Sequence, residues 1–430
     1  IEKMGFNFDK ASAVASVKLN SFGSPQSTID FKMETPDVEI APFGSFVSAV
    51  RAYALKGQAQ VKASAIGSLE NPNLNVSLIL KNLAGQSPEL KHPISDLDAQ
   101  INISGSSKAP EINIKTFKVK VASSDINLNG TISGQSTAPN MKIALSSKNL
   151  NVDELLGLKS LRLDNKTAEE KKVAEEQKKE ELQKLEASRK GGPAMPSLDE
   201  SLDQMAPELE KSLKNPMLDR ASASLTLNVS RLLAVGAEYK DLKMTANYAK
   251  RKLSNTSFSM KAYQGSLNAT LAMTLTASAP AFDLNSKLDG VSIGNFLEIH
   301  APSWKGMMSG NTKGTFSLSG QGLRKTQLDK NLNGKLDAQI VNGTMKMPVA
   351  AILAKVLNSM PSVSKKMENK EDPRGSFKTC KVQSSIKGRM IYLDDMDVVY
   401  DTEKMNLGDM RFQSKGTVAF DRMVDITGTA

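Results

Sequence analysis

The chain has 430 residues, 40% of them apolar but only 5% aromatic, so its apolar surface is aliphatic and lacks the aromatic anchors of a typical small-molecule site. Its formal charge of +10 admits an anionic partner, such as lipid head groups or nucleic acid, although lysines on solvated strand faces account for much of it. One cysteine excludes an intrachain disulfide, two histidines exclude a three-histidine metal site, and no apolar run reaches the ~18 residues of a membrane-spanning helix.

Along the chain, the main signal is an alternation of apolar and polar residues, which is typical of a strand with one apolar face. It is clear at 74–80 and returns at 221–229, 267–275 and 336–340, with mostly Ser, Thr, Asn or Lys at the polar positions. Turns rich in Gly, Asn, Ser and Pro separate such runs at intervals of about ten residues. This pattern predicts a meandering antiparallel sheet rather than parallel strands joined by helices.

A glycine-to-proline spacing repeats in the first third of the chain. Gly67, Gly105 and Gly134 are each followed five residues later by a proline, after which the alternation resumes. Glycine can end a strand, and proline fixes φ in a turn where no ladder donor is needed. The spacing therefore indicates duplicated strand–turn–strand units.

Helical pieces interrupt the strand pattern. Short helical turns are expected at 40–43, 152–156 and 293–297, where each would cap one end of the sheet. Over 159–220 the alternation stops, and the charge run at 165–190 predicts a solvated helix or a disordered insertion. Two further helices are expected, an amphipathic one with the apolar stripe Leu198, Leu202, Met205, Leu209 and Leu213, and one from Val349 to about Met360.

These elements divide the chain into a β-repeat segment at 1–158, the charged insertion at 159–220 and a second β region at 221–430. The two β regions are long enough for on the order of 25–30 strands. At about 4.8 Å per strand, such a sheet extends roughly 100 Å, and a sheet of that size twists and curls or splits in two. We therefore expect a mainly β protein, an elongated antiparallel sheet curled into a groove with a few short helices.

Motifs for catalysis are weak. The G-x-S-x-G match at 290–294 lacks the α/β context and the distant histidine of a nucleophile elbow, because His300 follows closely in an antiparallel region. Asp394, Asp395 and Asp397 lack the glycine-containing loop of a calcium site and are interpreted as a solvated turn. With no P-loop or H-E-x-x-H motif, we expect no catalytic residue, no metal and no cofactor. Without aromatic platforms among the basic residues, we expect no nucleic-acid partner.

Two long stretches resemble a known family. Residues 265–346 contain, in order, Gly-Ser-Leu-Asn-Ala, a short helical turn at 293–297, Gly-Thr-Phe-Ser-Leu-Ser-Gly-Gln-Gly, Leu-Asn-Gly-Lys-Leu and Val-Asn-Gly-Thr-Met. This order, with strands at 377–428, resembles the C-terminal region of the AsmA-like family, and 57–157 resembles an earlier strand-repeat unit of it. The insertion at 159–220 departs from the pattern of the family.

The resemblance implies a location and a role. AsmA-like proteins, related to the bridge-like TamB and YhdP type, are expected in the Gram-negative envelope, anchored in the inner membrane and projecting into the periplasm. Their implied role is outer-membrane assembly and lipid homeostasis. The usual N-terminal membrane helix is missing here, and the chain runs from Ile1 to Ala430 in what reads as mid-strand. We therefore expect it to be part of a longer protein, with its anchor elsewhere.

The resulting hypothesis is a non-enzymatic groove that shields lipid acyl chains. Shielding one CH₂ is worth about 0.8 kcal/mol, so a 16-carbon tail gains on the order of 10 kcal/mol. Expected partners are a phospholipid or other acyl lipid, the inner membrane and other envelope proteins. The 20 methionines suit either core gap-filling or an adaptable lining. The candidate lining residues are Leu74, Val76, Leu78, Leu80, Leu225, Leu227, Val229, Leu267, Leu271, Met273, Leu275, Leu336 and Ile340.

Two alternatives stay open at this point. The apolar faces could instead pack together in a dry core, giving a structural or chaperone-like scaffold that binds protein partners at its edges. An outer-membrane barrel is a third possibility, but the aromatic girdles expected of one are missing from the sequence.

Overall fold

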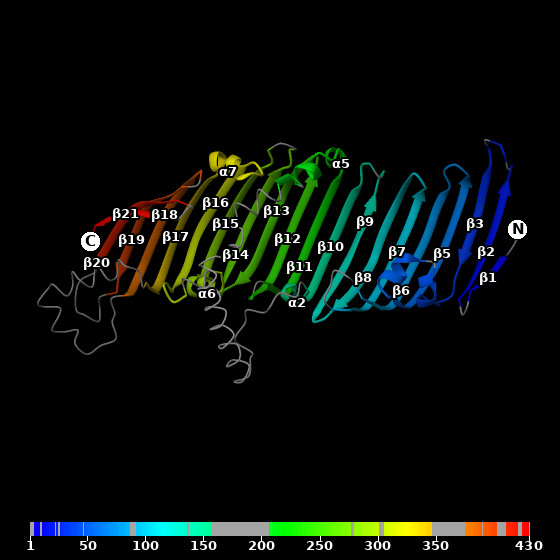
Figure 1. Ribbon diagram of the computed structural model, residues 1–430, viewed down its shortest axis with the longest axis horizontal. Helices are drawn as coiled ribbons and strands as arrows, with labels where there is room; N and C mark the ends of the chain where they lie inside the picture. Colours follow the sequence, from blue (N-terminus) through cyan, green and yellow to red (C-terminus); the bar gives the residue numbers. More distant parts are fainter. Residues whose placement is uncertain are drawn as a thin grey trace, which may run out of the picture.

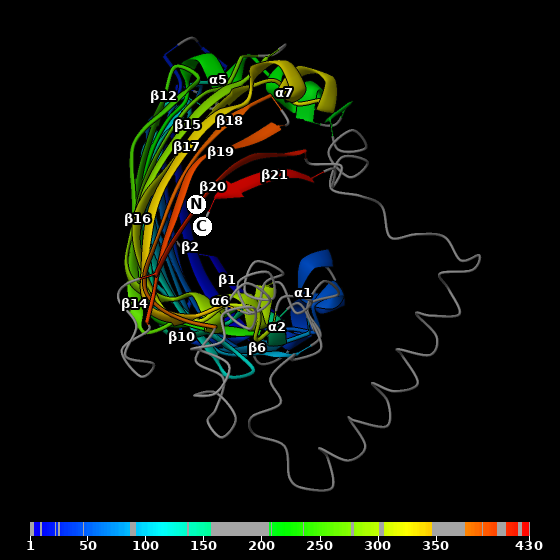
Figure 2. The same ribbon diagram turned by 90° about the vertical axis from the view of Figure 1, so that its left-hand side faces the viewer.

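The computed structural model contains one long curved sheet of 21 strands (Figure 1). In the residues that the structure describes, short helices lie along its two long rims (Figure 2). The mainly β, elongated fold expected from the sequence is thus confirmed. The structure describes residues 4–429 except 9–10, 22, 25, 46, 87–91, 136, 156–205, 208, 235, 277–278, 301–304, 346–374, 389, 402–409 and 420–423.

The elements follow one another along the chain and along the sheet. The first strands are β1 (Met4–Phe8), β2 (Ala11–Asn20), β3 (Thr28–Glu34), β4 (Val38–Glu39), β5 (Lys56–Ser68), β6 (Asn73–Gly85), β7 (Ile94–Ser106), β8 (Ala109–Val121), β9 (Ser124–Ser133) and β10 (Asn140–Asn151). The remaining strands are β11 (Ser222–Ala234), β12 (Ala237–Ala249), β13 (Lys252–Ala262), β14 (Gly265–Thr274), β15 (Ala281–Ser292), β16 (Asn311–Gln321), β17 (Asn333–Thr344), β18 (Ser376–Lys387), β19 (Met390–Tyr400), β20 (Met410–Ala419) and β21 (Val424–Thr429). The helices are η1 (Ala41–Ser45), α1 (Ser48–Ala52), α2 (Val152–Leu155), α5 (Met217–Arg220), α6 (Ile293–His300) and α7 (Lys325–Asn331).

One pair of strands departs from the expected antiparallel meander. Every strand pairs antiparallel with its neighbour except β10 and β11, which run parallel from Asn140 opposite Ser222 to Asn151 opposite Leu233. Parallel neighbours start at the same end of a sheet, so the chain must return across the full strand length between them. The segment predicted to be an insertion falls within this obligatory connection. We call the β10–β11 pair the seam.

Side chains hold the seam at one end. The Asp153 carboxylate, which is buried, accepts a hydrogen bond from the backbone N–H of Gly236 at 2.8 Å. The Arg231 guanidinium donates to the Asn149 side-chain oxygen at 3.0 Å across the seam. A parallel pair has no tight turn to set its register, and these contacts supply an alternative constraint.

The two long rims of the sheet differ in what they carry. Helices η1, α1, α2 and α6 lie along one rim, which we call the α6 rim, and α5 and α7 lie along the other, the α7 rim (Figure 2). Seen along the long axis, the sheet is C-shaped, and α1 lies inside its curve. Val50 of α1 packs with Leu80 and Leu97 of the sheet around the buried Leu83. The face that bears Leu80 is therefore the concave one.

The glycine-to-proline repeat has a physical reason at the α7 rim. Gly67, Gly105 and Gly134 adopt φ of +113°, +99° and +92° where β5, β7 and β9 turn into the next strand. At Gly134 a Cβ would lie 2.7 Å from the carbonyl oxygen of Ala138. Glycine is the residue that adopts this backbone without strain, so each copy of the motif marks one hairpin of the same rim.

The acidic cluster was predicted wrongly. Asp394, Asp395 and Asp397 lie within β19 and not in a turn. Asp397 is buried and accepts two hydrogen bonds from Arg411 of β20, at 2.5 and 2.7 Å, which lower the pKa of its carboxyl. The helices expected at 165–190 and from Val349 to Met360 lie outside the described residues.

Fully buried side chains are concentrated along the α6 rim. One cluster of Ile40, Ala59 and Leu83 lies under α1. A larger cluster, which we call the rim core, fills the same rim under α6 and is joined by partly buried Ile293 and Met308. The rim core consists of Ile340, Met345, Phe377, Cys380, Val398, Tyr400 and Phe412.

Candidate functional site

The strand register aligns the alternating apolar residues in rows along the length of the concave face. Residues paired directly across neighbouring strands share a face, and one such row is unbroken from β5 to β19, across the seam. We call it the Leu80 row. Only Ser286 and Ser384 interrupt its apolar character. Its members are Ala59, Leu80, Ala99, Phe117, Leu128, Leu145, Leu227, Met244, Phe258, Ala269, Ser286, Phe316, Leu336, Ser384 and Leu393.

A second row lies nearer the α7 rim, and we call it the Val76 row. Like the Leu80 row, it crosses the seam without a break, because Met141 of β10 pairs with Ala223 of β11. It ends where Phe282 meets Gly320. Its members are Val76, Ile103, Ile112, Ile132, Met141, Ala223, Tyr248, Leu253, Met273, Phe282 and Gly320.

The structure brings most of the predicted lining residues to this face. Leu80, Leu227 and Leu336 lie in the Leu80 row, and Val76 and Met273 lie in the Val76 row. The remaining strand residues share the parity of these rows, but Leu275 lies just beyond β14 at the α7 rim. The residues on intermediate or outer rows are Leu74, Leu78, Leu225, Val229, Leu267, Leu271 and Ile340.

Burial varies across the concave face. Val229 and Ile340, close to the α6 rim, are only 1% and 6% exposed. By contrast, Leu80, Leu227 and Leu336 are half-buried. A contiguous half-buried apolar surface of this length is unusual for a monomer and marks an interaction surface. The face therefore has a dry margin along the α6 rim and an accessible apolar middle.

The rim core encloses the single cysteine. Cys380 is fully buried between β17 and β19. Burial, with a smaller contribution from the Asp397 charge, raises the pKa of its thiol to about 12. The adjacent Phe377 ring packs against Gly343, where a Cβ would overlap it. The thiol is therefore inert in the folded protein.

Sequence reasoning missed a clamp at the α7 rim. The guanidinium of Arg251 donates to Asp219 at 2.5 Å and to the carbonyl oxygens of Leu213 and Leu275 at 2.6 and 3.1 Å. These bonds hold residues 209–220 against the β12–β13 turn, and the Arg251 contact lowers the pKa of the Asp219 carboxyl. We call residues 209–220 the strap.

The expected amphipathic stripe is only partly buried in the strap. Leu213 is buried, as the helical pattern predicted, whereas Leu209 is 40% exposed. Glu210 accepts a hydrogen bond from Arg324, next to α7, at 3.1 Å. Leu198, Leu202 and Met205 lie outside the described residues.

An aromatic cluster on the α6 rim was also missed. The Tyr263 ring meets Phe296 of α6 edge to face at 5.7 Å between ring centroids, and its hydroxyl contacts His300. The Tyr239 hydroxyl lies 3.2 Å from that of Tyr263. Burial and the Tyr239 contact raise the pKa of Tyr263. These contacts attach α6 to the rim and give His300 a packing role there.

Three arrangements considered in the sequence are missing from the described part of the chain. Within it, no group of His, Cys, Asp and Glu side chains is arranged to hold a metal ion. Ser292 ends an antiparallel strand, so the surroundings of a nucleophile elbow are absent there. None of the helices in the described ranges is long and apolar enough to cross a membrane.

Comparison with known proteins gives one match. A family model described as the AsmA family matches residues 19–392, which include the seam and most of the strands of the concave face. No curated protein and no solved structure matches the chain.

Proposed function

The chain belongs to the AsmA family of bacterial envelope proteins, which are involved in outer-membrane assembly or lipid transport, and from this premise we propose that its concave face shields lipid acyl chains in transit between the inner and outer membranes. The observation that carries the proposal is the unbroken Leu80 row, apolar and largely half-buried from one end of the sheet toward the other.

Energetics favour acyl chains as the occupants of this face. Each CH₂ removed from water stabilises the complex by about 0.8 kcal/mol. Because the lining is aliphatic and carries few polar groups, it makes similar contacts with any tail and selects weakly among them. Continuity matters more than affinity at one point, because a tail that moves along the Leu80 row meets polar side chains only at Ser286 and Ser384.

The distribution of buried residues supports this proposal over a structural scaffold whose apolar faces pack together. A scaffold that only packs its faces together would bury Leu80, Leu227 and Leu336 as fully as the rim core buries Phe377. Instead, both clusters of buried apolar residues lie along the α6 rim, while Leu80, Leu227 and Leu336 are only half-buried. We propose further that the groove lies in the periplasm and is tethered to the inner membrane by a segment outside this chain.

The test places a charge on one face or the other. In Leu78→Asp/Leu271→Asp, two carboxylates enter the concave face, and in the matched control Ser77→Asp/Thr270→Asp the adjacent residues carry the same charges on the opposite face. Native mass spectrometry with lipid extraction should find phospholipids of mixed chain length on the parent and on the control, and none on the concave variant. Equal lipid content in both variants, or lipid-free parent protein, would refute the groove.

A further inference from the structure

Charged residues are paired differently at the two rims. Near the α6 rim, lysines have acidic partners on neighbouring strands. Lys120 lies 2.9 Å from Asp96, and Lys261 lies 2.7 Å from Asp241. Lys305 likewise pairs with Glu298 of α6. These pairs neutralise part of the basic charge of that rim, where Arg51, Lys56 and Lys148 are exposed and make no ion pair within the described ranges.

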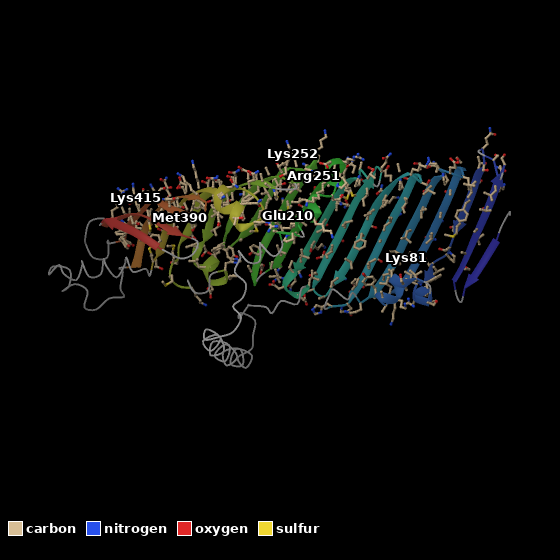
Figure 3. All side chains as sticks on the ribbon, turned by 45° about the horizontal axis from the view of Figure 1, so that its top comes forward. Lys81, Glu210, Arg251, Lys252, Met390 and Lys415 are labelled. Carbon is tan, nitrogen blue, oxygen red and sulfur yellow. The ribbon has the colours of Figure 1, made fainter. Side chains whose placement is uncertain are left out.

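At the α7 rim, several exposed basic residues have no acidic partner. Glu210 and Asp219 are already held by Arg324 and Arg251. Figure 3 shows Arg251 and Lys252 together on this rim. Exposed basic side chains here make no ion pair with any acidic residue of the described ranges, and we call them the basic edge. They are Lys108, Lys211, Lys214, Arg220, Lys250, Lys252, Lys330 and Lys387.

The basic edge borders the apolar rows directly. Lys252 opens β13 and is exposed, and the next residue, Leu253, belongs to the Val76 row on the concave face. One strand residue rises about 3.3 Å. An anionic group bound at Lys252 therefore lies within a few ångströms of an apolar surface that leads toward the Leu80 row.

We propose that the basic edge binds the phosphate of lipid head groups, so that lipids lie across the concave face with their heads at the α7 rim and their tails toward the α6 rim. The proposal rests on the proposed groove function and gives it an orientation. Charge complementarity carries it, because a row of unpaired cations beside an apolar lining matches the two ends of such a molecule. At the α6 rim, by contrast, ion pairs such as Lys120–Asp96 and Lys261–Asp241 occupy several of the basic side chains.

The test compares two lipids that share a tail. Binding of phosphatidylglycerol and of diacylglycerol, each with the same fluorescent acyl chain, is measured on the parent and on Lys250→Gln/Lys252→Gln/Lys330→Gln. The control Lys120→Gln/Lys261→Gln/Lys305→Gln removes the same charge from the α6 rim. Three lost contacts at exposed lysines should weaken phosphatidylglycerol binding about tenfold at low salt and less at high salt, and should leave diacylglycerol binding unchanged.

Each other outcome decides against part of the proposal. Equal phosphatidylglycerol binding by both triple variants would overturn the assigned orientation while leaving the groove intact, provided that diacylglycerol binds. Failure of the parent to bind either lipid would overturn groove and orientation together. Glycerol phosphate that binds as tightly as phosphatidylglycerol would assign the edge to a small anion. If the variant of the basic edge no longer sediments with phosphatidylglycerol vesicles but still binds monomeric phosphatidylglycerol, the basic edge would be assigned to a membrane surface.

Discussion

Replacing Phe377 by alanine should open the rim core and expose the only thiol of the chain. Phe377 is 2% exposed and packs against Gly343, which leaves no space for the core to collapse onto the missing ring. Phe→Ala changes at such sites cost about 3–5 kcal/mol through lost burial and the cavity that remains. Since each 1.4 kcal/mol is tenfold in an equilibrium constant, the open fraction of this region should rise by about two to four orders of magnitude.

Cys380 provides the assay, because labelling of a buried thiol requires local opening. The folded thiol is fully buried and its raised pKa keeps it protonated, so reaction with an aromatic disulfide reagent at pH 8 should follow the open fraction. The control is Leu271→Ala, in the half-buried middle of the face and outside the rim core. A Phe377→Ala rate within about threefold of the parent, or an equal acceleration in the control, would refute the packing argument.

Three further outcomes follow from the same contacts. Gly343→Ala should cost about 1–3 kcal/mol in urea unfolding because its methyl overlaps both the Phe377 ring and the backbone carbonyl oxygen of Ser309. Phe377→Ala removes only the first overlap, so the double variant should cost less than the sum of the single variants; additive costs would contradict the overlap with the ring. Raising the pH above 9.0 should progressively weaken the rim core, since the unfolded Cys380 thiol ionises there while the folded pKa is about 12; a Cys380→Ser variant should lack this dependence in thermal melts. The Arg251 contact depresses the pKa of Asp219 below 3.8, so the clamp contributes stability above that value and loses it as the pH falls; proteolysis of the strap by pepsin should accelerate only in that acid range, and Asp219→Asn should be cleaved readily at higher pH as well.

The strand faces could be predicted from the sequence because alternation is a local signal. Leu225 and Leu227 alternate with polar residues, and any regular strand places them on one face whatever its neighbours are. The acidic cluster in β19 misled because the register shifts between Leu393 and Met396, which breaks the period of two and makes a strand read as a turn.

Other features depend on contacts between distant residues and left no local signal. The parallel seam pairs two strands that a long connection separates in the sequence. The residues of β10 or β11 alone do not indicate whether the two strands pair parallel or antiparallel. Likewise, no local pattern indicates the clamp, because the carbonyl groups that Arg251 binds belong to the distant residues Leu213 and Leu275. The rim core was missed because the alternation marks apolar faces without saying where along a strand they are covered.

The seam also sets an order of assembly. Hairpins such as β5–β6 join residues a few positions apart, whereas β10 and β11 can pair only after the chain between Asn151 and Ser222 has closed a long loop, which costs more entropy and slows pairing. Two meanders should therefore form early and meet late, each with one strand edge exposed in the meantime. A slip of one residue there would turn every downstream apolar side chain to the convex face. The hydrogen bonds of Asp153 and Arg231 form in the native register, so they favour the correct pairing of the two halves of the sheet.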